Sequence, residues 1–493
     1  MLIKRAKFIL IVAVMALAAM TAMACQSIAG QSSSPQPTNT PTPTSNYVGH
    51  FSLSPSSGLP GTVVKATGNG FAADMQLEIV WQGFSGSWQV GNGTFQGRQF
   101  KDQPESMAPV TTDAAGQFQA TFTVPDGFGF SHDVLVMKDG QVQNKAAFEV
   151  TMQAAISPSS GSVGTPITVE LKGVGWRPLE NSWVLLYDNK FTGWLSAVTT
   201  DGHASAVIPA VGALGEHTIQ IVHASATFPY LNMQQSPQPN RPTWTFKFMV
   251  TDGSPILPPP AQEQALTIEQ GTSPSAIVGA SLWVNPASGL IGTPVTLKGE
   301  GLPSGQSLDI LWFRMTGNRV GGQGWQETSV KLGTVMVGAN GAVDFSFPAP
   351  DDLGGSHRIE AQANGQKLAE TYFTITPSAF GIEPSSGPVG TTITIHLKGV
   401  GWTQTANIYT LVYDNGYLGY ACGFNSQGDV TIYLPAAGEP GWHFIDLYPG
   451  IYQGADMNQV NDFRIPQLTF KDDHPGERLP AFHFAFRITE GGN

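Results

Sequence analysis

Two short polar triplets are the residues best suited to touch a ligand. Tyr187-Asp188-Asn189 and Tyr413-Asp414-Asn415 each end an apolar run of strand length. Carboxylates, amides and aromatic rings at one edge suit sugar hydroxyls and the apolar faces of sugar rings. Asp and Asn after a strand are also common turn formers, because they hydrogen-bond nearby backbone groups and tolerate left-handed conformations. We expect turns here, with a ligand-binding edge as the alternative.

Aromatic side chains in two glycine-containing stretches form a second candidate. Trp88 lies in a stretch that follows LEIVW, and Trp325 lies in the stretch that follows the matching LDILW. The first stretch also carries Phe84, Phe95 and Phe100. Long loops with aromatic residues at the edge of a scaffold are reasonable binding loops, so Trp88 and Trp325 are candidate ligand contacts. The alternative is that these residues fold back onto a core.

A third cluster is acidic and lies near the C-terminal end. Asp472, Asp473, His474 and Glu477 flank a Pro-Gly turn. A calcium site needs six or more oxygen ligands at set positions, so we expect an exposed acidic loop and no metal site.

Sequence signatures of catalysis are missing from the chain. It contains no HExxH, no Gly-x-Ser-x-Gly, no phosphate-binding loop and no Cys-x-x-Cys, and its two cysteines are Cys25 and Cys422. We therefore predict a protein that is not an enzyme and carries no cofactor.

The elements that must position these residues are identified by an internal repeat. One phrase occurs four times, with Pro, Ser-Gly and Gly-Thr at fixed spacing; the copies are SPSSGLPGT at 54–62, SPSSGSVGT at 157–165, NPASGLIGT at 285–293 and EPSSGPVGT at 383–391. Pro cannot donate to a strand ladder, and the glycines permit a tight reversal. Each phrase therefore predicts a turn at the start of a separately folded module.

A strand with alternating apolar residues follows each phrase, as Ile393, Ile395 and Leu397 illustrate. This period of two predicts sheets with one buried face. The next glycine comes six residues after the Gly-Thr threonine in copies one and three, and eight residues after it in copies two and four. The chain is thus all-β, with four β-sandwich domains in an A-B-A-B duplication. The predicted divisions are a signal peptide (1–24), a disordered tether (25–46), domains A1 (47–152) and B1 (153–251), a Pro-rich linker (252–280), and domains A2 (281–377) and B2 (378–491).

A histidine recurs at one position of every repeat. The four copies are His132, His217, His357 and His443. One such residue per domain leaves them too far apart to share a metal, so we expect each to tie down a loop by a side-chain hydrogen bond.

The repeat resembles the IPT/TIG-type immunoglobulin-like domains of bacterial surface proteins. The resemblance rests on the four Pro-Ser-Gly/Gly-Thr phrases with their alternating strands and Gly-x-Gly turns, and it covers residues 47–491. It implies extracellular β-sandwiches that serve as spacers, adhesive modules or accessories to surface enzymes, and it implies no single activity.

The N-terminus resembles a bacterial lipoprotein signal. Lys4, Arg5 and Lys7 precede an apolar run, and small residues lead to Cys25, the candidate lipidation site. A Pro/Thr/Ser-rich tether follows, which is typical of an extended, solvated segment. The expected location is extracytoplasmic, anchored by lipid to the cell membrane or cell surface. The alternative is an ordinary secretory signal that is cleaved nearby.

The composition of the chain limits the classes of partner that it is expected to bind. The formal net charge is −12 and no basic run occurs in the mature part of the chain, so nucleic acid, which is bound mainly through Lys and Arg, is excluded as a partner. We expect a non-enzymatic, membrane-anchored surface lipoprotein that acts as a modular binding, adhesion or structural scaffold, with a surface protein or polysaccharide as partner. A carbohydrate-binding accessory protein using the aromatic loops is the first alternative, and a surface enzyme acting on polysaccharide is the second.

Overall fold

The computed structural model describes residues 47–225, 228–236, 241–259, 279–317, 324–423, 426–452 and 463–491. Gly49–Asn493 forms one compact unit, and the descriptions below concern its described residues. The predicted signal peptide, Cys25 and the tether to residue 46 lie outside the described residues.

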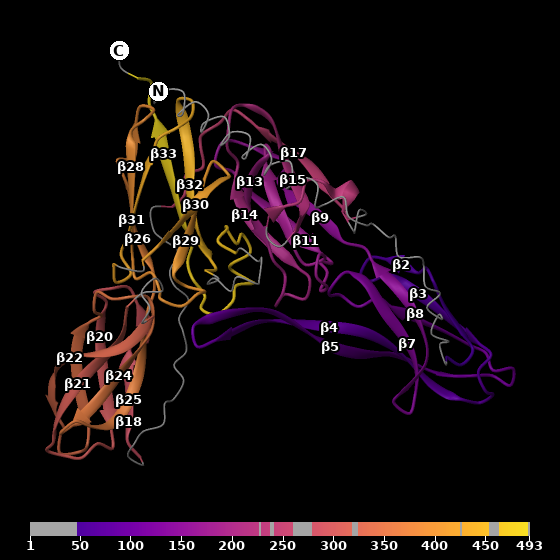
Figure 1. Cartoon of the computed structure of the whole chain (residues 1–493), viewed down its shortest axis with the longest axis horizontal. Coiled ribbons are helices and arrows are strands. Elements are labelled where there is room, and N and C mark those ends of the chain that lie inside the picture. Colours follow the sequence, from indigo (N-terminus) through magenta and orange to yellow (C-terminus); the bar gives the residue numbers. More distant parts are fainter. Residues whose placement is uncertain are drawn as a thin grey trace, which may run out of the picture. The chain divides into compact units, whose positions relative to one another are not determined.

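Strands are the main regular element of the described structure (Figure 1). The only helical segment among the described residues is a single 3₁₀ turn at Met233–Gln235. Within those residues, no helix is long and apolar enough to cross a membrane. The prediction of an all-β chain is confirmed.

The strands fall into four successive sets, which keep the names A1, B1, A2 and B2. A1 contains β1 (His50–Ser54), β2 (Ser57–Gly58), β3 (Val63–Asn69), β4 (Gln76–Gly91), β5 (Thr94–Thr111), β6 (Phe118–Thr123), β7 (Phe130–Lys138) and β8 (Gln141–Val150). B1 contains β9 (Gln153–Ser157), β10 (Ser160–Gly161), β11 (Pro166–Lys172), β12 (Trp183–Tyr187), β13 (Lys190–Leu195), β14 (Ala204–Pro209), β15 (Gly215–Ser225), β16 (Phe228–Pro229) and β17 (Trp244–Val250).

The second half repeats this order. A2 contains β18 (Ser281–Asn285), β19 (Ser288–Gly289), β20 (Pro294–Glu300), β21 (Ser307–Gly317), β22 (Trp325–Met336), β23 (Val343–Pro348), β24 (Gly355–Ala363) and β25 (Gln366–Ile375). B2 contains β26 (Ser378–Glu383), β27 (Ser386–Gly387), β28 (Thr392–Lys398), β29 (Ile408–Tyr413), β30 (Gly416–Cys422), β31 (Val430–Pro435), β32 (Gly441–Gly450) and β33 (Phe482–Ile488).

Each set makes one sandwich of two sheets. In A1 a three-stranded sheet in the order β1-β3-β6 faces a five-stranded sheet in the order β2-β8-β7-β4-β5. B2 has the same plan, with β26-β28-β31 facing β27-β33-β32-β29-β30. The first strand of each domain continues into a short strand that pairs in parallel with the last strand, as β2 does with β8 and β27 with β33. This change of sheet by the first strand, together with the strand order, is an immunoglobulin-like topology.

The repeated phrase forms the crossing between the two sheets. In all four copies the peptide bond before the phrase's proline is cis, and the Ser-Gly pair forms the short parallel strand. A Cβ on the glycine of that pair would stand 2.6 Å from the hydroxyl of Thr62 in copy one and 2.6 Å from that of Thr293 in copy three. A side chain on this glycine would therefore crowd the threonine four residues later, which explains the fixed spacing between Ser-Gly and Gly-Thr in the repeat.

Alternation along the strands places the cores where the sequence indicates. Ile393, Ile395 and Leu397 of β28 are fully buried, while Thr394 and His396 between them are not. A2 has a core of its own around Trp312 and Phe373. The core of B1 is different, since it continues through Phe444, Tyr448 and Leu468 of B2.

The junction between an A domain and the following B domain is the same in both halves. Gly129 N donates to Val174 O at 3.1 Å in the first half, and Gly354 N donates to Val400 O at 3.1 Å in the second. A Cβ on Gly129 would overlap the carbonyl oxygen of Gly173, and one on Gly354 would overlap the carbonyl oxygen of Gly399. Backbone thus meets backbone at each junction.

The start of the linker lies against B1. Ser162 Oγ donates to Ser254 O at 2.8 Å, and Ile256 N donates to Val163 O at 2.9 Å. The described part of the segment, to residue 259, is therefore attached to the domain that precedes it. Residues 260–278 lie outside the described residues.

Candidate functional site

The stretch that carries Trp88 is a long hairpin. β4 and β5 pair from Gln76↔Thr111 to Gly91↔Thr94, with register shifts at Ile79/Val80 and Gln89/Val90, so the predicted glycine-containing loop is a paired ladder. In Figure 1 this hairpin extends from A1 towards B2. At its tip, Phe95 N donates to Gln404 Oε1 and Gln404 N donates to Gly93 O, both at 2.7 Å.

The carboxylate of Asp473 is the point at which three domains meet. Its Oδ1 accepts hydrogen bonds from Trp88 Nε1 at 2.8 Å, Thr199 N at 2.9 Å and Thr199 Oγ1 at 2.8 Å. Its Oδ2 accepts a hydrogen bond from Val198 N at 2.7 Å. We call this arrangement of Trp88 and Arg98 from A1, Val198 and Thr199 from B1, and Asp473 from B2 the three-domain joint.

Arg98 supplies the opposite charge at the joint. Burial lowers the pKa of Arg98 to about 10, and the nearby Asp473 carboxylate opposes that change, so the guanidinium stays charged at neutral pH. Its Nη1 donates to Asn181 O at 3.1 Å. The guanidinium carbon lies 5.8 Å from the ring centre of Trp194 and 5.9 Å from that of Phe463, within range of cation–π attraction.

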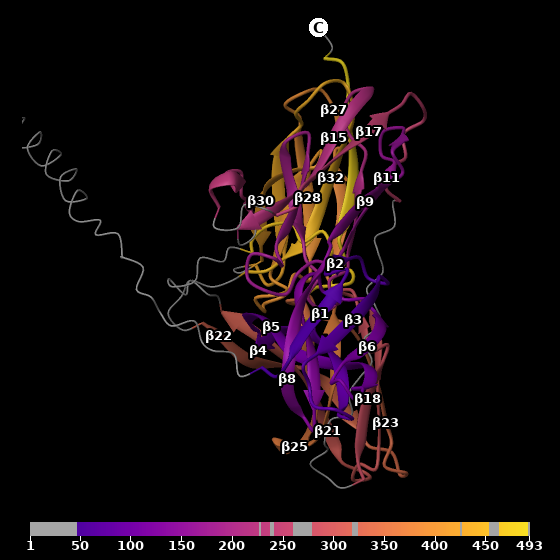
Figure 2. The same ribbon diagram turned by 90° about the vertical axis from the view of Figure 1, so that its right-hand side faces the viewer.

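B1 and B2 lie side by side next to the joint. Trp194 N donates to Pro466 O at 2.8 Å, and Leu468 N donates to Trp194 O at 2.9 Å. Ser196 Oγ and Thr469 Oγ1 are 2.8 Å apart. Figure 2, which views the molecule from the B1 side of Figure 1, shows the strands of B1 in front of those of B2.

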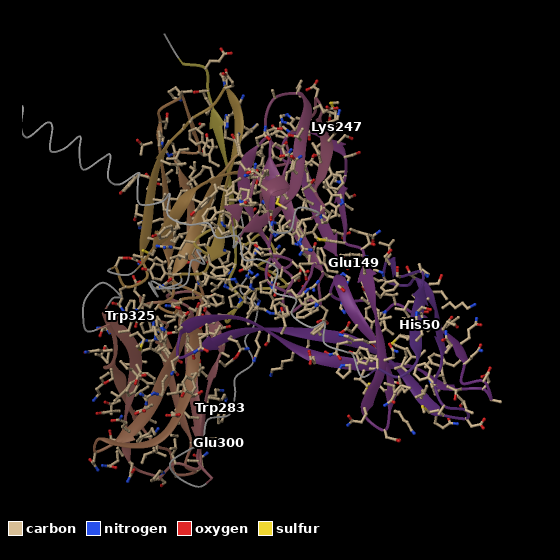
Figure 3. All side chains as sticks on the ribbon, turned by 45° about the vertical axis from the view of Figure 1, so that its right-hand side comes forward. His50, Glu149, Lys247, Trp283, Glu300 and Trp325 are labelled. Atoms are coloured by element: carbon tan, nitrogen blue, oxygen red, sulfur yellow. The ribbon has the colours of Figure 1, made fainter. Side chains whose placement is uncertain are left out.

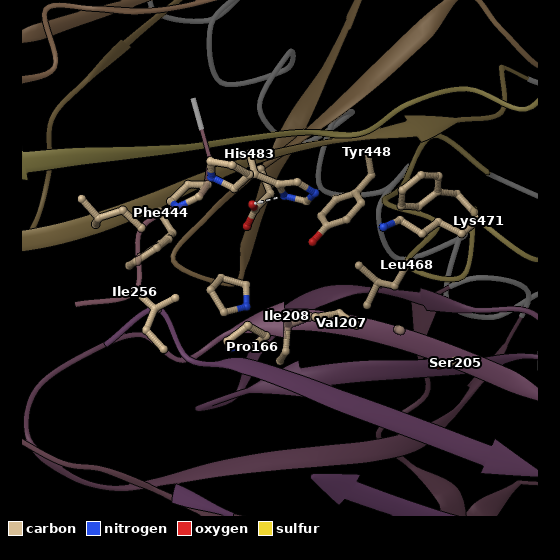
Figure 4. A pocket seen from close by; sticks show the side chains of 18 of the residues that line it. Pro166, Ser205, Val207, Ile208, Ile256, Phe444, Tyr448, Leu468, Lys471 and His483 are labelled. Atoms are coloured by element: carbon tan, nitrogen blue, oxygen red, sulfur yellow. Dashed lines mark hydrogen bonds and ion pairs between the residues drawn. The ribbon is translucent and has the colours of Figure 1, made fainter. Parts of the chain in front are cut away.

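A cavity of about 430 Å³ lies between the two B domains. Phe444, Tyr448, Leu468 and Phe470 of B2 and the segment Ser205–Pro209 of B1 form much of its wall, and the described end of the linker lines it as well. Figure 4 shows the hydroxyl of Tyr448 and the ammonium of Lys471 pointing into the space between B2 and B1.

A buried acid–imidazole pair lies in the same wall. Asp446 of β32 and His483 of β33 are opposite each other in the ladder, and His483 Nδ1 is 2.6 Å from Asp446 Oδ1. The side chain of Asp446 is only 3% exposed, and its Oδ2 is buried without a hydrogen-bond partner among the described residues.

The first predicted triplet forms a turn within B1. Asp188 and Asn189 have φ of 48° and 61° and connect β12 to β13 as a two-residue hairpin. Tyr187 is buried and donates its hydroxyl hydrogen to Val211 O at 2.8 Å. Asp188 accepts from Thr218 N at 2.9 Å, so its carboxylate ties the turn to β15. The structure therefore shows the expected turn, and Tyr187 is not on the surface.

The second triplet forms the same turn, but it also builds the B1–B2 interface. Tyr413 donates to Ala437 O at 2.8 Å, and Asp414 accepts from Phe444 N at 2.9 Å. Asn415 is 1% exposed, because its Nδ2 donates to Pro209 O of B1 and its carbonyl accepts from Thr192 Oγ1 of B1. The two triplets are equivalent in sequence, but only the second crosses between domains.

The two candidate tryptophans lie at different places in the structure. Trp88 is half-buried at the three-domain joint. Trp325 lies at the end of A2 (Figure 3) and packs edge-on against Trp402 of B2, with 6.3 Å between ring centres. Neither ring lies on a free loop, and the structure does not bring the two together as one site.

The expectation of an exposed acidic loop is wrong for most of its members. Asp473 is fully buried at the joint, and only Asp472 of the acids is exposed. Burial lowers the pKa of His474 to about 4 and raises the pKa of Glu477 above its usual range. The loop was misjudged because its partners lie in A1 and B1, hundreds of residues away. Among the described residues, no group of three or more His, Cys, Asp and Glu side chains converges as metal ligands would.

The repeated histidine does tie down a loop, as predicted. His132 Nε2 lies 2.8 Å from Phe128 O, and the same four-residue contact is made by His217 to Ala213, His357 to Leu353 and His443 to Glu439. In the B domains the other ring nitrogen faces Asp188 or Asp414, whereas in the A domains it faces a backbone carbonyl.

Sequence reasoning missed Arg98, Asp446 and His483. A signal for His483 is present in the strand FHFAF, where a histidine occupies an alternate position. The corresponding ladder pair of B1 is Gln220↔Thr245, so of the two B domains only B2 carries ionisable groups there.

Comparisons with known proteins give only weak likenesses. No family model and no curated protein matches the sequence. The chain is similar to a Salmonella alpha-2-macroglobulin reacted with methylamine, at 11% identity and a TM-score of 0.19, over 90% of this chain and 31% of that one, so it spans about a third of that protein. It is also similar to invasin, a bacterial integrin-binding protein, at 12% identity and a TM-score of 0.18, over 90% of this chain and 79% of that one.

A third likeness is to a membrane anchored protein from Corynebacterium diphtheriae, at 12% identity and a TM-score of 0.17, over 90% of this chain and 91% of that one. Scores this low carry no argument about function. The immunoglobulin-like fold rests on the sheet topology described above.

Proposed function

We propose that this chain is an extracytoplasmic surface lipoprotein, anchored through Cys25, whose IPT/TIG-type domains form a non-enzymatic binding scaffold with fixed internal geometry. The signal-like N-terminus with its tether supports the anchored location. The repeat phrase supports the domain type. Fixed geometry is the part of the proposal that the contacts between domains support.

The single observation that carries the proposal is the burial of Asp473 among donors from two other domains. A spacer needs contacts only between successive domains. Here Trp88 reaches a carboxylate 385 residues further along the chain, and a buried carboxylate is tolerated only when its hydrogen bonds are complete. A joint of this kind holds A1, B1 and B2 in one arrangement, which serves a protein that presents surfaces at set positions.

Single-molecule energy transfer on the mature chain tests the geometry. Dyes at Lys65→Cys in A1 and Tyr433→Cys in B2, with Cys25 and Cys422 replaced by Ser, should give one narrow transfer efficiency. Adding Trp88→Ala and Asp473→Ala should broaden the distribution, while Lys145→Ala, which removes an exposed ion pair with Asp133, should leave it narrow. A broad distribution in the parent protein contradicts the proposal.

The anchor is tested separately in cells. Cys25→Ser should move the protein from the membrane fraction to the soluble extracytoplasmic fraction, because a lipid chain on this residue is the proposed attachment. Retention of the variant in the membrane fraction contradicts attachment through Cys25.

A further inference from the structure

We propose that the cavity between B1 and B2 binds a neutral sugar, with Asp446 as its anchoring acceptor. This site is distinct from the three-domain joint and from the aromatic residues first singled out in the sequence. It does not depend on the lipid anchor, but it rests on the fixed arrangement of B1 and B2, because both domains supply the walls of the cavity.

The unpartnered oxygen of Asp446 indicates that a donor belongs in the cavity. Asp446 Oδ1 is engaged by His483, but Oδ2 is buried and has no partner among the described residues. A buried charged acceptor left without a hydrogen bond is costly, so such groups are rare except where a ligand or water completes them. Asp446 lines the cavity, and although its Oδ2 has almost no exposed surface, a turn of the carboxylate would bring that oxygen within reach of a bound molecule.

The residues that line the cavity indicate the other chemical features of the ligand. Phe444, Tyr448 and Phe470 line the same space as Asp446, so one molecule can meet both aromatic carbon and a carboxylate. A volume of about 430 Å³ lies in the range of small-molecule sites, which combine apolar walls with a few polar groups. A sugar ring has this dual character, because its hydroxyls donate and accept while its C–H face is apolar.

The charged residues that line the cavity argue against two other classes of ligand, fatty acids and compact cations. Lys471 and Asp472 both line the cavity beside Asp446 and His483, so neither sign of charge dominates. A fatty acid would leave Asp446 Oδ2 unpaired and bring a second carboxylate close to it. A compact cation would pair with Asp446, but the ammonium of Lys471 lines the same cavity and would repel it. A neutral polyhydroxylated ring satisfies Asp446 without these conflicts and offers an acceptor to Lys471.

The first experiment measures binding of the mature full chain to an array of neutral mono- to tetrasaccharides, followed by titration calorimetry with the strongest binder. The informative variant is Asp446→Gln with His483→Thr, because Gln and Thr are the residues that B1 carries at the same ladder position and B1 folds with them. Loss of a hydrogen bond to a charged group predicts an affinity at least about tenfold weaker.

Two further variants keep the outcome interpretable. Lys471→Ala changes an exposed side chain, so it should weaken binding several-fold without altering the unfolding temperature. His396→Gln changes a histidine on the opposite sheet of B2, where it contacts Thr431, and should leave the affinity unchanged.

The result expected is full-affinity saccharide binding by the parent protein and by His396→Gln, and weaker binding by the other two variants. The inference is overturned if the parent binds no neutral saccharide, if the Asp446→Gln, His483→Thr protein binds as tightly as the parent, or if arginine amide or palmitate binds the cavity in place of sugars. None of these outcomes changes the energy-transfer result, so failure here is distinguishable from failure of the scaffold proposal.

Discussion

At the scale of single residues, the joint depends on one carboxylate and its donors. Asp473 receives four hydrogen bonds, and Arg98 supplies a buried positive charge nearby. Removing the charge leaves buried donors without a matching acceptor, which costs more than the net gain from forming an ordinary hydrogen bond.

We therefore expect Asp473→Asn to lower the free energy of unfolding by about 3 kcal/mol. Its neighbour provides the matched control, because Asp472 is exposed and Asp472→Asn should change stability by less than about 0.5 kcal/mol. Guanidinium unfolding followed by tryptophan fluorescence measures both. Equal effects from the two substitutions would refute the role given to Asp473.

The pair of His443 and Asp414 makes the stability of B2 depend on pH. Burial disfavours the charged imidazole, but the hydrogen bond and charge of Asp414 outweigh burial, so the pKa of His443 is raised. A histidine whose pKa is higher in the folded state contributes stability that is fully present below its unfolded pKa of about 6.5 and is lost as pH rises through the raised value.

NMR titration should show that Asp414→Asn lowers the pKa of His443. His443→Gln should remove the corresponding loss of stability above about pH 6.5 in unfolding experiments at a series of pH values. An unchanged imidazole titration in Asp414→Asn would contradict this assignment.

At the scale of elements, glycines set the junction inside each A–B pair. Gly129 and Gly354 each bring backbone against backbone, so a side chain at either position must push the two domains apart. Gly129→Ala and Gly354→Ala should each cost about 1–3 kcal/mol, the usual range for overpacking.

Hydrogen exchange at the amides of Gly129 and Gly354 measures the opening of these junctions, and faster exchange is expected in the substituted junction only. Gly338→Ala is the control, since its Cβ would meet no atom nearer than Asn340 Oδ1 at 3.1 Å, and that side chain can move. Protection of the amides at positions 129 and 354 as strong as in the parent would show that the junctions tolerate a side chain.

Much of this level could be predicted from sequence. The alternation of Ile393, Ile395 and Leu397 fixes which face of β28 is buried, and the Gly-Thr phrase marks each crossing between sheets. Both signals are local. The stretch after LEIVW is predicted to be a glycine-containing loop, but it forms the paired hairpin β4–β5. Its contacts with Gln404 and Asp473 could not be predicted, because those residues lie in another domain. Asp473 is predicted to be a surface acid because its hydrogen-bond donors lie in A1 and B1, far away in the sequence. The cavity is assembled from B1, the linker and B2, so no local sequence pattern indicates it.

At the scale of the whole molecule, the two A–B units meet through their B domains and through the β4–β5 hairpin of A1, which reaches B2. The apolar contact of Phe444, Tyr448 and Leu468 with the B1 core, together with the hydrogen bonds of Trp194 and Asn415, forms an interface between halves of one chain. Interfaces of this composition hold separate chains together when apolar burial and hydrogen-bond pairing are both satisfied.

Two separately produced halves, residues 47–259 and 279–491, should therefore associate as a one-to-one complex. Size-exclusion chromatography with light scattering detects the complex, and Asp473→Ala in the second half should weaken it by at least about tenfold. Halves that elute as separate monomers at micromolar concentration would show that the connecting segment, rather than the interface, keeps the units together.

The length of chain between Trp88 and Asp473 has a consequence for folding during synthesis. A polypeptide that emerges N-terminus first presents the β4–β5 hairpin long before B2 has been made. Phe95 and its neighbours therefore remain exposed to water until B2 has folded. During that interval the tip is an exposed aromatic surface of the kind that holdase chaperones recognise. Premature termination anywhere upstream of residue 473 would leave the first domain, not merely the missing one, open to aggregation and proteolysis.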